Sequence, residues 1–334
     1  VLYSASGQGF LKLLGQGMNI IVALGAMWLI ARVPPHVIEK IALWFYVLSL
    51  LMLIAVCFLG SIKNGAQRWL DLGIIQIQPS ELMRIAMPML LARYFSRLEQ
   101  KPNHINFGVA TLLLLIPTVL IGHQPDLGTA LLVLASGFFV LFLAGLDKRL
   151  IIAGVFILIA SVKIIWPLLH DYQRRRIEIL LNPTQDPLGA GYHIIQSMIA
   201  IGSGGWYGKG WTHGTQSKLD FIPERTTDFI FAVFSEEFGL IGNVLLLSLL
   251  CLLVMRGLVI AKQARSIFSR LLAGGISLTL FTYTFVNMGM VSGILPVVGV
   301  PLPLISYGGT AMVTLCISLG ILMSIQSHRH LVAT

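Results

Sequence analysis

Long runs of apolar residues, uninterrupted by charge, recur along this chain. Five of them contain no Asp, Glu, Lys or Arg: residues 41–60, 127–146, 238–255, 271–297 and 302–327. A mostly apolar run of about 18 residues or more is long enough to cross a lipid bilayer as a helix. Four further segments are shorter, or carry a few basic residues, but are still apolar enough to span. We therefore predict nine membrane-spanning helices, near residues 17–33, 41–60, 82–98, 105–121, 127–146, 150–169, 229–255, 271–293 and 304–326.

The composition agrees with a membrane environment. Of 334 residues, 56% are hydrophobic and 11% are charged, whereas about a quarter of the residues in a soluble domain are charged. The fold class that follows is all-α, a polytopic membrane helical bundle forming a single domain over residues 1–334. The opening segment reads as the end of an element, so a tenth helix is expected upstream. Cys57, Cys251 and Cys316 fall inside predicted spans, which indicates neither a disulfide framework nor metal-ligand spacing.

The distribution of charge predicts an orientation. If residues 1–10 lie outside, the connections on the inner side and the C-terminal tail carry the whole formal net charge of +9. Acidic and basic residues then balance on the outer side, as the positive-inside rule leads us to expect. The basic excess therefore reflects topology. A nucleic-acid partner is not indicated, because no continuous basic and aromatic surface is apparent.

Two connections on the predicted outer side are long enough to carry function, residues 61–80 and 170–227. Within the second, residues 192–211 are first apolar and then rich in glycine, ending in GSGGWYGKGW. This segment is too short to span. It is expected to lie in the membrane interface, to dip in as a re-entrant segment, or to act as a plain loop hinge. No nucleotide-binding glycine motif occurs, which argues against a nucleotide-driven pump.

Ionisable residues stand at several span entrances, where burial in the membrane is costly and function is common. In QIQPSELMR (76–84), Ser80 is expected to cap a helix, and Glu81 and Arg84 lie three apart on one helix face. The spacing fits a functional role for Glu81 and Arg84 and fits equally well a capped helix with a surface ion pair. Asp126 in HQPDLG opens the next span, and helix capping is its simplest role.

The densest group of charges is PERTTDFIFAVFSEEFG (223–239). Asp228 stands at the mouth of a span, Glu224 and Arg225 precede it, and Glu236 and Glu237 follow inside the helix. Such a carboxylate is a candidate general base. The proline- and glycine-rich segment 293–311 lies between two spans, and its broken backbone needs a protein-lined or watery cavity.

These stretches resemble a known family in order and spacing: GAQRWLDLG, QPSE, QPDLGTA, NPTQDPLGAGYHIIQS, IGSGGWYGKGW, HGTQSKLDFIPERTTDFIFA and NMGMVSGILPVVGVPLPLISYGGTA. The chain is identified over nearly its full length as similar to the shape, elongation, division and sporulation family, and to its RodA branch rather than its FtsW branch. The resemblance implies ten helices with both termini cytoplasmic. It also implies a peptidoglycan glycosyltransferase that polymerises lipid II at the outer face of the cytoplasmic membrane, together with a class B penicillin-binding protein that crosslinks the strands.

The resemblance carries site residues onto this sequence. The catalytic acid of the TDF motif falls on Asp228, and the PSE glutamate and the basic residue after it fall on Glu81 and Arg84. The other residues expected to bind substrate lie in or beside matching motifs: Arg68, Gln124, Asp126, Arg225, Glu237 and Ser306. Two positions depart from the pattern. Thr226 stands where the family often has His, and Arg84 stands where Lys is common.

Joining two sugars requires a base at the acceptor hydroxyl and positive charge at the departing pyrophosphate. Asp228 is the expected base, and Arg68, Arg84 and Arg225 are expected to neutralise the pyrophosphate, together with a divalent cation, Mg or Mn. An α-linked donor and a β-linked product imply a single inverting displacement. Two other functions stay open: a lipid II flippase, which would use the same polar cavity and proline-broken helices, and a non-catalytic scaffold for the penicillin-binding protein.

Overall fold

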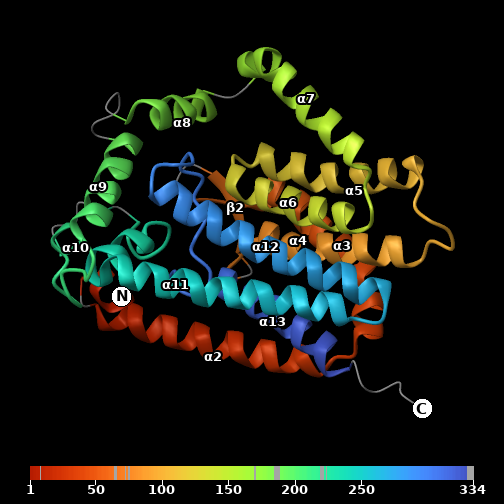
Figure 1. Ribbon diagram of the computed structural model, residues 1–334, viewed down its shortest axis with the longest axis horizontal. Helices are drawn as coiled ribbons and strands as arrows, with labels where there is room; N and C mark the ends of the chain where they lie inside the picture. The colour runs from red at the N-terminus through yellow and green to blue at the C-terminus, as the bar shows by residue number, and fades with distance from the viewer. Residues whose placement is uncertain are drawn as a thin grey trace. The chain divides into compact units, whose positions relative to one another are not determined.

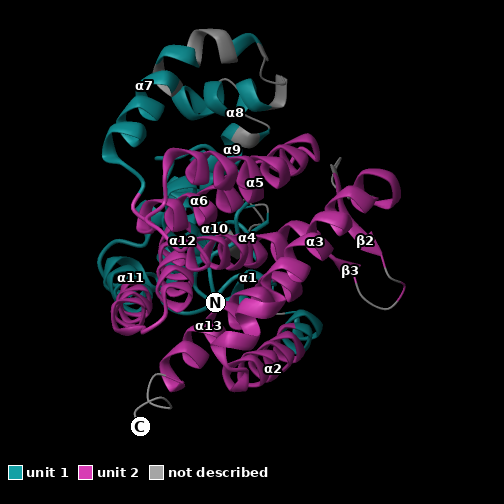
Figure 2. Cartoon of the chain, turned by 90° about the vertical axis from the view of Figure 1, so that its right-hand side faces the viewer, with its two compact units in different colours: residues 1–15, 146–250, 283–307 teal, residues 16–145, 251–282, 308–334 magenta. Residues whose placement is uncertain are grey.

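The structure, a computed structural model, is mostly helical (Figure 1). It describes residues 1–7, 9–63, 66–71, 73, 76–168, 171–183, 189–218, 222 and 224–328. Parts of three motifs quoted above, within 65–75, 184–188 and 219–223, and the tail 329–334 lie outside the described residues. The chain divides into two compact units, coloured separately in Figure 2. Unit 1 comprises residues 1–15, 146–250 and 283–307, and unit 2 comprises residues 16–145, 251–282 and 308–334.

Helices occupy all nine ranges predicted to span a membrane. They are α2 (Phe10–Arg32), α3 (Pro35–Leu59), α4 (Pro79–Ser96), α5 (His104–His123), α6 (Leu127–Leu143), α7 (Lys148–Ile165), α11 (Ile230–Gln263), α12 (Ile267–Val291) and α13 (Gly309–Ser327). Among the described residues, α2, α3, α5, α11, α12 and α13 are long and apolar enough to cross a membrane. The chain is therefore a multi-pass membrane protein, and the exact number of spans stays a prediction.

The last helix begins later than expected. The apolar run predicted a span from residue 304, but α13 begins at Gly309. Pro301 and Pro303 lack a backbone N–H and disfavour a helix around them, and the segment before Gly309 is irregular. This irregular segment runs beside the turn that carries Asp228.

Helix α4 forms the interior of unit 2. Most of its residues are buried, and it packs against α3, α6 and α13. Glu81 and Arg84 near its start are buried as well, and they pair with each other, which offsets part of the cost of burying two charges. The helices α5 and α6 also approach closely, because Gly137 of α6 leaves room for Leu114 of α5: a Cβ at this glycine would lie 2.4 Å from the leucine Cδ1.

A small antiparallel sheet corrects the all-α expectation within residues 61–80. Strands β1 (Ser61–Lys63), β2 (Ala66–Asp71) and β3 (Gln76–Ile77) pair in the order β1-β2-β3. This segment was predicted only as a long connection. Folding it back on itself pairs backbone groups that would otherwise need water.

The predicted long connection 170–227 in unit 1 is also more ordered than expected. It contains α8 (Asp171–Leu181), α9 (Ala190–Ser203) and the short α10 (Thr215–Lys218). The apolar segment YHIIQSMIAI lies in α9, where Ser197 Oγ donates a hydrogen bond of 2.8 Å to the carbonyl oxygen of Val291 in α12. The remaining short helices of unit 1 are α1 (Leu2–Ala5) and the 3₁₀ helix η1 (Trp166–Leu168).

The glycine-rich turn after α9 packs tightly on α11. A Cβ at Gly204 would lie 2.2 Å from the carbonyl oxygen of Ser235, and one at Gly208 would lie 2.1 Å from that of Glu237. Helix α11 breaks at Gly239, which has φ 65° and ψ −162°. The two α11 amides after this break, Leu240 N and Ile241 N, donate to the carbonyl oxygens of Gly205 and Trp206 at 2.9 and 3.1 Å. The glycines therefore serve close backbone packing here.

Candidate active site

Asp228 lies in a compact turn of unit 1 directly before α11. Within residues 224–229, the amides of Thr227 and Phe229 both donate to the carbonyl oxygen of Glu224, at 3.0 and 3.2 Å. Glu224 adopts φ +47°, which closes the turn tightly. The Asp228 side chain is half-buried, and its Oδ2 lies beside the backbone of Gly299, where a Cβ would be 3.4 Å away. The carboxylate is thus bordered by the irregular segment that follows α12.

Three consecutive carbonyl oxygens of this turn, those of residues 226–228, accept hydrogen bonds from α12 and from the irregular segment that follows it. Tyr307 N donates to Thr226 O at 2.9 Å, and Ser306 Oγ donates to Thr227 O at 2.6 Å. Asn287 Nδ2 donates to the carbonyl oxygen of Asp228 at 2.9 Å. The backbone that presents the Asp228 carboxylate is therefore hydrogen-bonded at residues 226, 227 and 228.

The charged residues before Asp228 take different positions. Glu224 is exposed, and one of its carboxylate oxygens accepts a hydrogen bond from Thr227 Oγ1 at 3.0 Å. Arg225 is half-buried, and a Cβ at Gly7 would lie 3.5 Å from its Nη2. Arg225 is the basic residue nearest to Asp228 in the sequence.

Glu236 and Glu237 of α11 bind the segment 209–216, and both are buried. Glu236 Oε1 accepts bonds of 2.8 Å from Lys209 Nζ and of 2.8 Å from Thr215 N. Glu237 Oε1 accepts 3.0 Å from Thr212 N and also a bond from the Ser4 hydroxyl. These carboxylates hold the end of the glycine-rich turn on α11.

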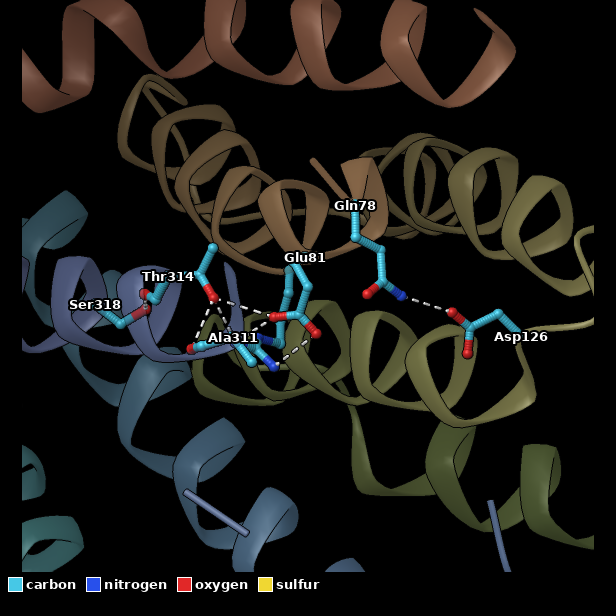
Figure 3. Close-up of polar contacts among 7 residues, drawn as sticks. Gln78, Glu81, Asp126, Ala311, Thr314 and Ser318 are labelled. Atoms are coloured by element: carbon cyan, nitrogen blue, oxygen red, sulfur yellow. Dashed lines mark hydrogen bonds and ion pairs between the residues drawn. The ribbon is translucent and has the colours of Figure 1, made fainter. Parts of the chain in front are cut away.

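In unit 2, Glu81 and Arg84 of α4 form a buried ion pair. Figure 3 shows Glu81 with its neighbour Thr314. Arg84 Nη2 lies 2.8 Å from Glu81 Oε2, and both residues are at most 6% exposed. Thr314 of α13 joins them: it accepts from Arg84 Nη2 at 3.0 Å and lies 3.0 Å from Glu81 Oε2. The surface-pair interpretation is therefore wrong. Ser80 is also not the helix cap, because α4 begins at Pro79 with Gln78 as its N-cap residue.

A second cluster of unit 2 gathers around Asp126, the N-cap of α6. Its Oδ1 accepts from Thr129 N at 3.3 Å, which confirms the capping role, and its Oδ2 accepts from Gln78 Nε2 at 3.0 Å (Figure 3). Arg68 on β2 approaches Asp126 Oδ1 at 3.9 Å and donates to the carbonyl oxygens of Gln124 and Pro125. The buried Gln124 side chain donates to Leu53 O in α3 at 2.9 Å.

Comparison with known proteins identifies the same family as the sequence motifs that contain these residues. The family model of the FtsW, RodA and SpoVE proteins, described as cell cycle protein, matches residues 2–331. The chain belongs to this family. It is 54% identical over 334 residues to the peptidoglycan glycosyltransferase MrdB of Escherichia coli K12, covering 100% of this chain and 90% of that protein.

Two solved structures resemble this family member over nearly its whole length. One chain, from a study of how a peptidoglycan synthase complex coordinates polymerisation and crosslinking, has 34% identity and a TM-score of 0.85, covering 98% of this chain and 94% of that chain. The rod shape determining protein RodA of Thermus thermophilus has 29% identity and a TM-score of 0.74, covering 98% and 91%. The resemblance to RodA expected from the motifs is confirmed.

The structure groups the predicted site residues of this family member into separate clusters. Asp228, Arg225 and Ser306 lie together in unit 1, with Glu237 further along α11. In unit 2, Glu81 pairs with Arg84, and Arg68, Gln124 and Asp126 form the second cluster. The direct substrate role of each residue stays a prediction.

The sequence reasoning missed the partners of these residues, Asn287, Thr314 and Gln78. Asn287 opens a motif quoted above, NMGMVSG, and that motif was the available signal. Gln78 likewise opens the quoted motif QPSE. Thr314 is uncharged and lies outside the quoted motifs, so neither charge nor a motif could select it. Among the residues that the structure describes, no three His, Cys, Asp or Glu side chains gather in a way that would hold a metal ion.

Proposed function

We propose that this protein polymerises lipid II into glycan strands at the outer face of the cytoplasmic membrane, during cell elongation and rod-shape maintenance, with Asp228 as the general base. The observation that carries the proposal is the position of Asp228: it is half-buried on a turn in which the carbonyl oxygens of residues 226–228 all accept hydrogen bonds. A base on a fixed backbone can meet an acceptor hydroxyl in a constant geometry. The 54% identity to a peptidoglycan glycosyltransferase supports the proposed polymerising activity.

The proposed reaction is one inverting displacement. The acceptor hydroxyl oxygen attacks the anomeric carbon of the donor, its proton passes to Asp228, and the bond from that carbon to the pyrophosphate oxygen breaks. Undecaprenyl pyrophosphate leaves. Arg225, three residues before Asp228 in the same turn, supplies positive charge for the departing group. Arg68 and Arg84 are proposed for the same purpose, although both also bind protein groups of unit 2.

A divalent cation, Mg or Mn, is part of the proposal, with a restricted role. The described residues offer no group of three acidic, His or Cys side chains to hold one. A cation would therefore take most of its ligands from the substrate pyrophosphate and water, as Mg²⁺ commonly does. Titrating Mg²⁺ or Mn²⁺ into metal-depleted protein tests this: polymerisation at the full rate in the presence of a chelator would remove the cation from the proposal.

The arrangement in the membrane and the partner are further parts of the proposal. We propose ten helices in the full-length protein, both termini cytoplasmic, and residues 170–227 on the outer side. Labelling of single introduced cysteines from either side of the membrane would test the topology. We also propose a class B penicillin-binding protein as partner, which is supported by the likeness to a chain of a peptidoglycan synthase complex.

Replacing Asp228 by Asn tests the catalytic assignment. Purified Asp228→Asn protein should bind lipid II but form no polymer, because the amide cannot take up the acceptor proton. Asp147→Asn is the matched control, since Asp147 is exposed in the connection between α6 and α7. Polymerisation by Asp228→Asn at the wild-type rate would show that Asp228 is not the base.

Reconstituted liposomes separate the enzyme from its two alternatives. Polymer formed from lipid II presented on one side supports the enzyme. Transbilayer movement of labelled lipid II without polymer would support a flippase. A scaffold for the penicillin-binding protein would produce neither, and the charged groups bonded inside both units, such as Glu81 and Glu236, speak against so passive a role.

A further inference from the structure

The three hydrogen bonds to the Asp228 turn suggest roles for residues that the reaction itself does not assign. Two of the three donors are side chains, those of Ser306 and Asn287, and both residues are buried. We propose that Ser306 and Asn287 are positioning residues, which hold the backbone that aims the Asp228 carboxylate. This inference rests on the proposed function, in which Asp228 acts as the base.

Ser306 was expected to bind substrate, but its hydroxyl group is committed to the protein. A hydroxyl has one proton to donate, and the Ser306 proton goes to the carbonyl oxygen of Thr227 at 2.6 Å. The Ser306 Oγ atom also accepts a hydrogen bond from Leu302 N at 2.7 Å. Ser306 thus joins the irregular segment before α13 to the turn that carries Asp228.

Asn287 connects the same turn to a second point of that segment. Its amide nitrogen has two protons, and it lies 2.9 Å from the carbonyl oxygen of Asp228 and 2.6 Å from that of Val300. The residue before Val300 is Gly299, whose backbone borders Asp228 Oδ2. The buried Asn287 side chain therefore holds both the Asp228 backbone and the backbone next to Gly299, which borders the Asp228 carboxylate.

A positioning role has a kinetic signature that differs from substrate binding. If the turn loosens, Asp228 reaches the acceptor hydroxyl in a productive geometry less often, so kcat falls while KM stays near the wild-type value. Misplacement by about 1 Å can cost on the order of 100-fold in rate. A residue that touches substrate in the ground state would instead raise KM when it is removed.

The test measures lipid II polymerisation by Ser306→Ala and Asn287→Ala. We expect kcat to fall by roughly 10- to 100-fold in each, with KM little changed. Ser306→Thr keeps the hydroxyl and should recover part of the rate. Ser292→Ala and Asn243→Ala are matched controls, because the Ser292 hydroxyl, directly after α12, donates to Met288 O of that helix, and the Asn243 amide oxygen accepts from Ser235 within α11. Wild-type kcat in Ser306→Ala and Asn287→Ala would overturn the inference, and so would a raised KM at unchanged kcat.

A second measurement does not depend on activity. The amides of Thr227 and Phe229 are bonded inside the turn, and their hydrogen exchange in folded protein should accelerate in Ser306→Ala and Asn287→Ala but not in the controls. Unchanged exchange would overturn the positioning role even if the rate fell. The two proposals can be tested separately. Full activity in Asp228→Asn would contradict the proposed base. Hydrogen exchange at the wild-type rate in the Ser306 and Asn287 variants would contradict only the positioning role.

Discussion

The hydroxyl of Thr314 on α13 lies 3.0 Å from Glu81 Oε2 on α4 and also accepts a hydrogen bond from Arg84. An ion pair formed within one helix is thereby bonded to a second helix that follows more than two hundred residues later. Figure 3 shows Glu81 and Thr314 meeting between the two helices. Because all three residues are buried, the contact should matter to the stability of unit 2.

Removing the Thr314 hydroxyl should destabilise the protein measurably. Thr314→Val keeps the shape of the side chain but leaves part of the buried charge unsatisfied, at a cost of about 1–3 kcal/mol in the free energy of unfolding. Thr314→Ser is the matched variant and should lose much less, because it retains the hydroxyl. Unfolding in detergent, followed by circular dichroism, measures both. Equal stabilities for the two variants would argue that the hydroxyl contributes little.

Breaking the buried ion pair from one side should cost more than replacing both partners. Arg84→Leu leaves the Glu81 carboxylate buried without its cation and should destabilise the protein by about 3–5 kcal/mol, whereas the double variant Glu81→Leu, Arg84→Leu should recover a large part of the loss. The comparison uses the same unfolding measurement. In the polymerisation assay, Glu81→Ala should also weaken activity, and a wild-type rate there would make the pair purely structural.

The close packing of the glycine-rich turn predicts different outcomes at two neighbouring glycines. Gly208 has φ +78°, and a Cβ there would lie 2.1 Å from a backbone oxygen of α11. Gly208→Ala should therefore displace the turn and cost about 2 kcal/mol or more. A Cβ at Gly202 in α9 meets nothing within 4 Å, so Gly202→Ala should be neutral or slightly stabilising. Limited proteolysis in lipid nanodiscs compares them, and equal protection would contradict the packing described here.

The cap at the start of α6 should account for a defined part of the role of Asp126. Asp126→Ala removes the bond to Thr129 N and the contact with Gln78, and should cost about 1 kcal/mol or somewhat more. Asp126→Ser restores an N-cap oxygen without the carboxylate charge and should regain the capping share. If both variants keep wild-type stability but lose polymerisation, the Asp126 carboxylate acts on substrate and not on the helix.

Several features of the fold could be predicted from local sequence. Each predicted span contains a helix, because an apolar run long enough to cross a bilayer must satisfy its own backbone hydrogen bonds. The family was also recognisable, since its motifs are contiguous in the chain. By contrast, the sheet at residues 61–77 and the helices α8 and α9 were expected only as connections, because neither segment has the length of apolar sequence that marks a span.

Local sequence is enough to predict the membrane helices, the family and the charged residues at the helix entrances. The partners of those residues become apparent only in the folded chain: Thr314 for the Glu81 and Arg84 pair, and Asn287 and Ser306 for the turn of Asp228. The difference lies in the range of each interaction. Burial of an apolar run depends on neighbouring residues, whereas a hydrogen bond between residues far apart in the chain exists only after packing has brought them within about 3 Å.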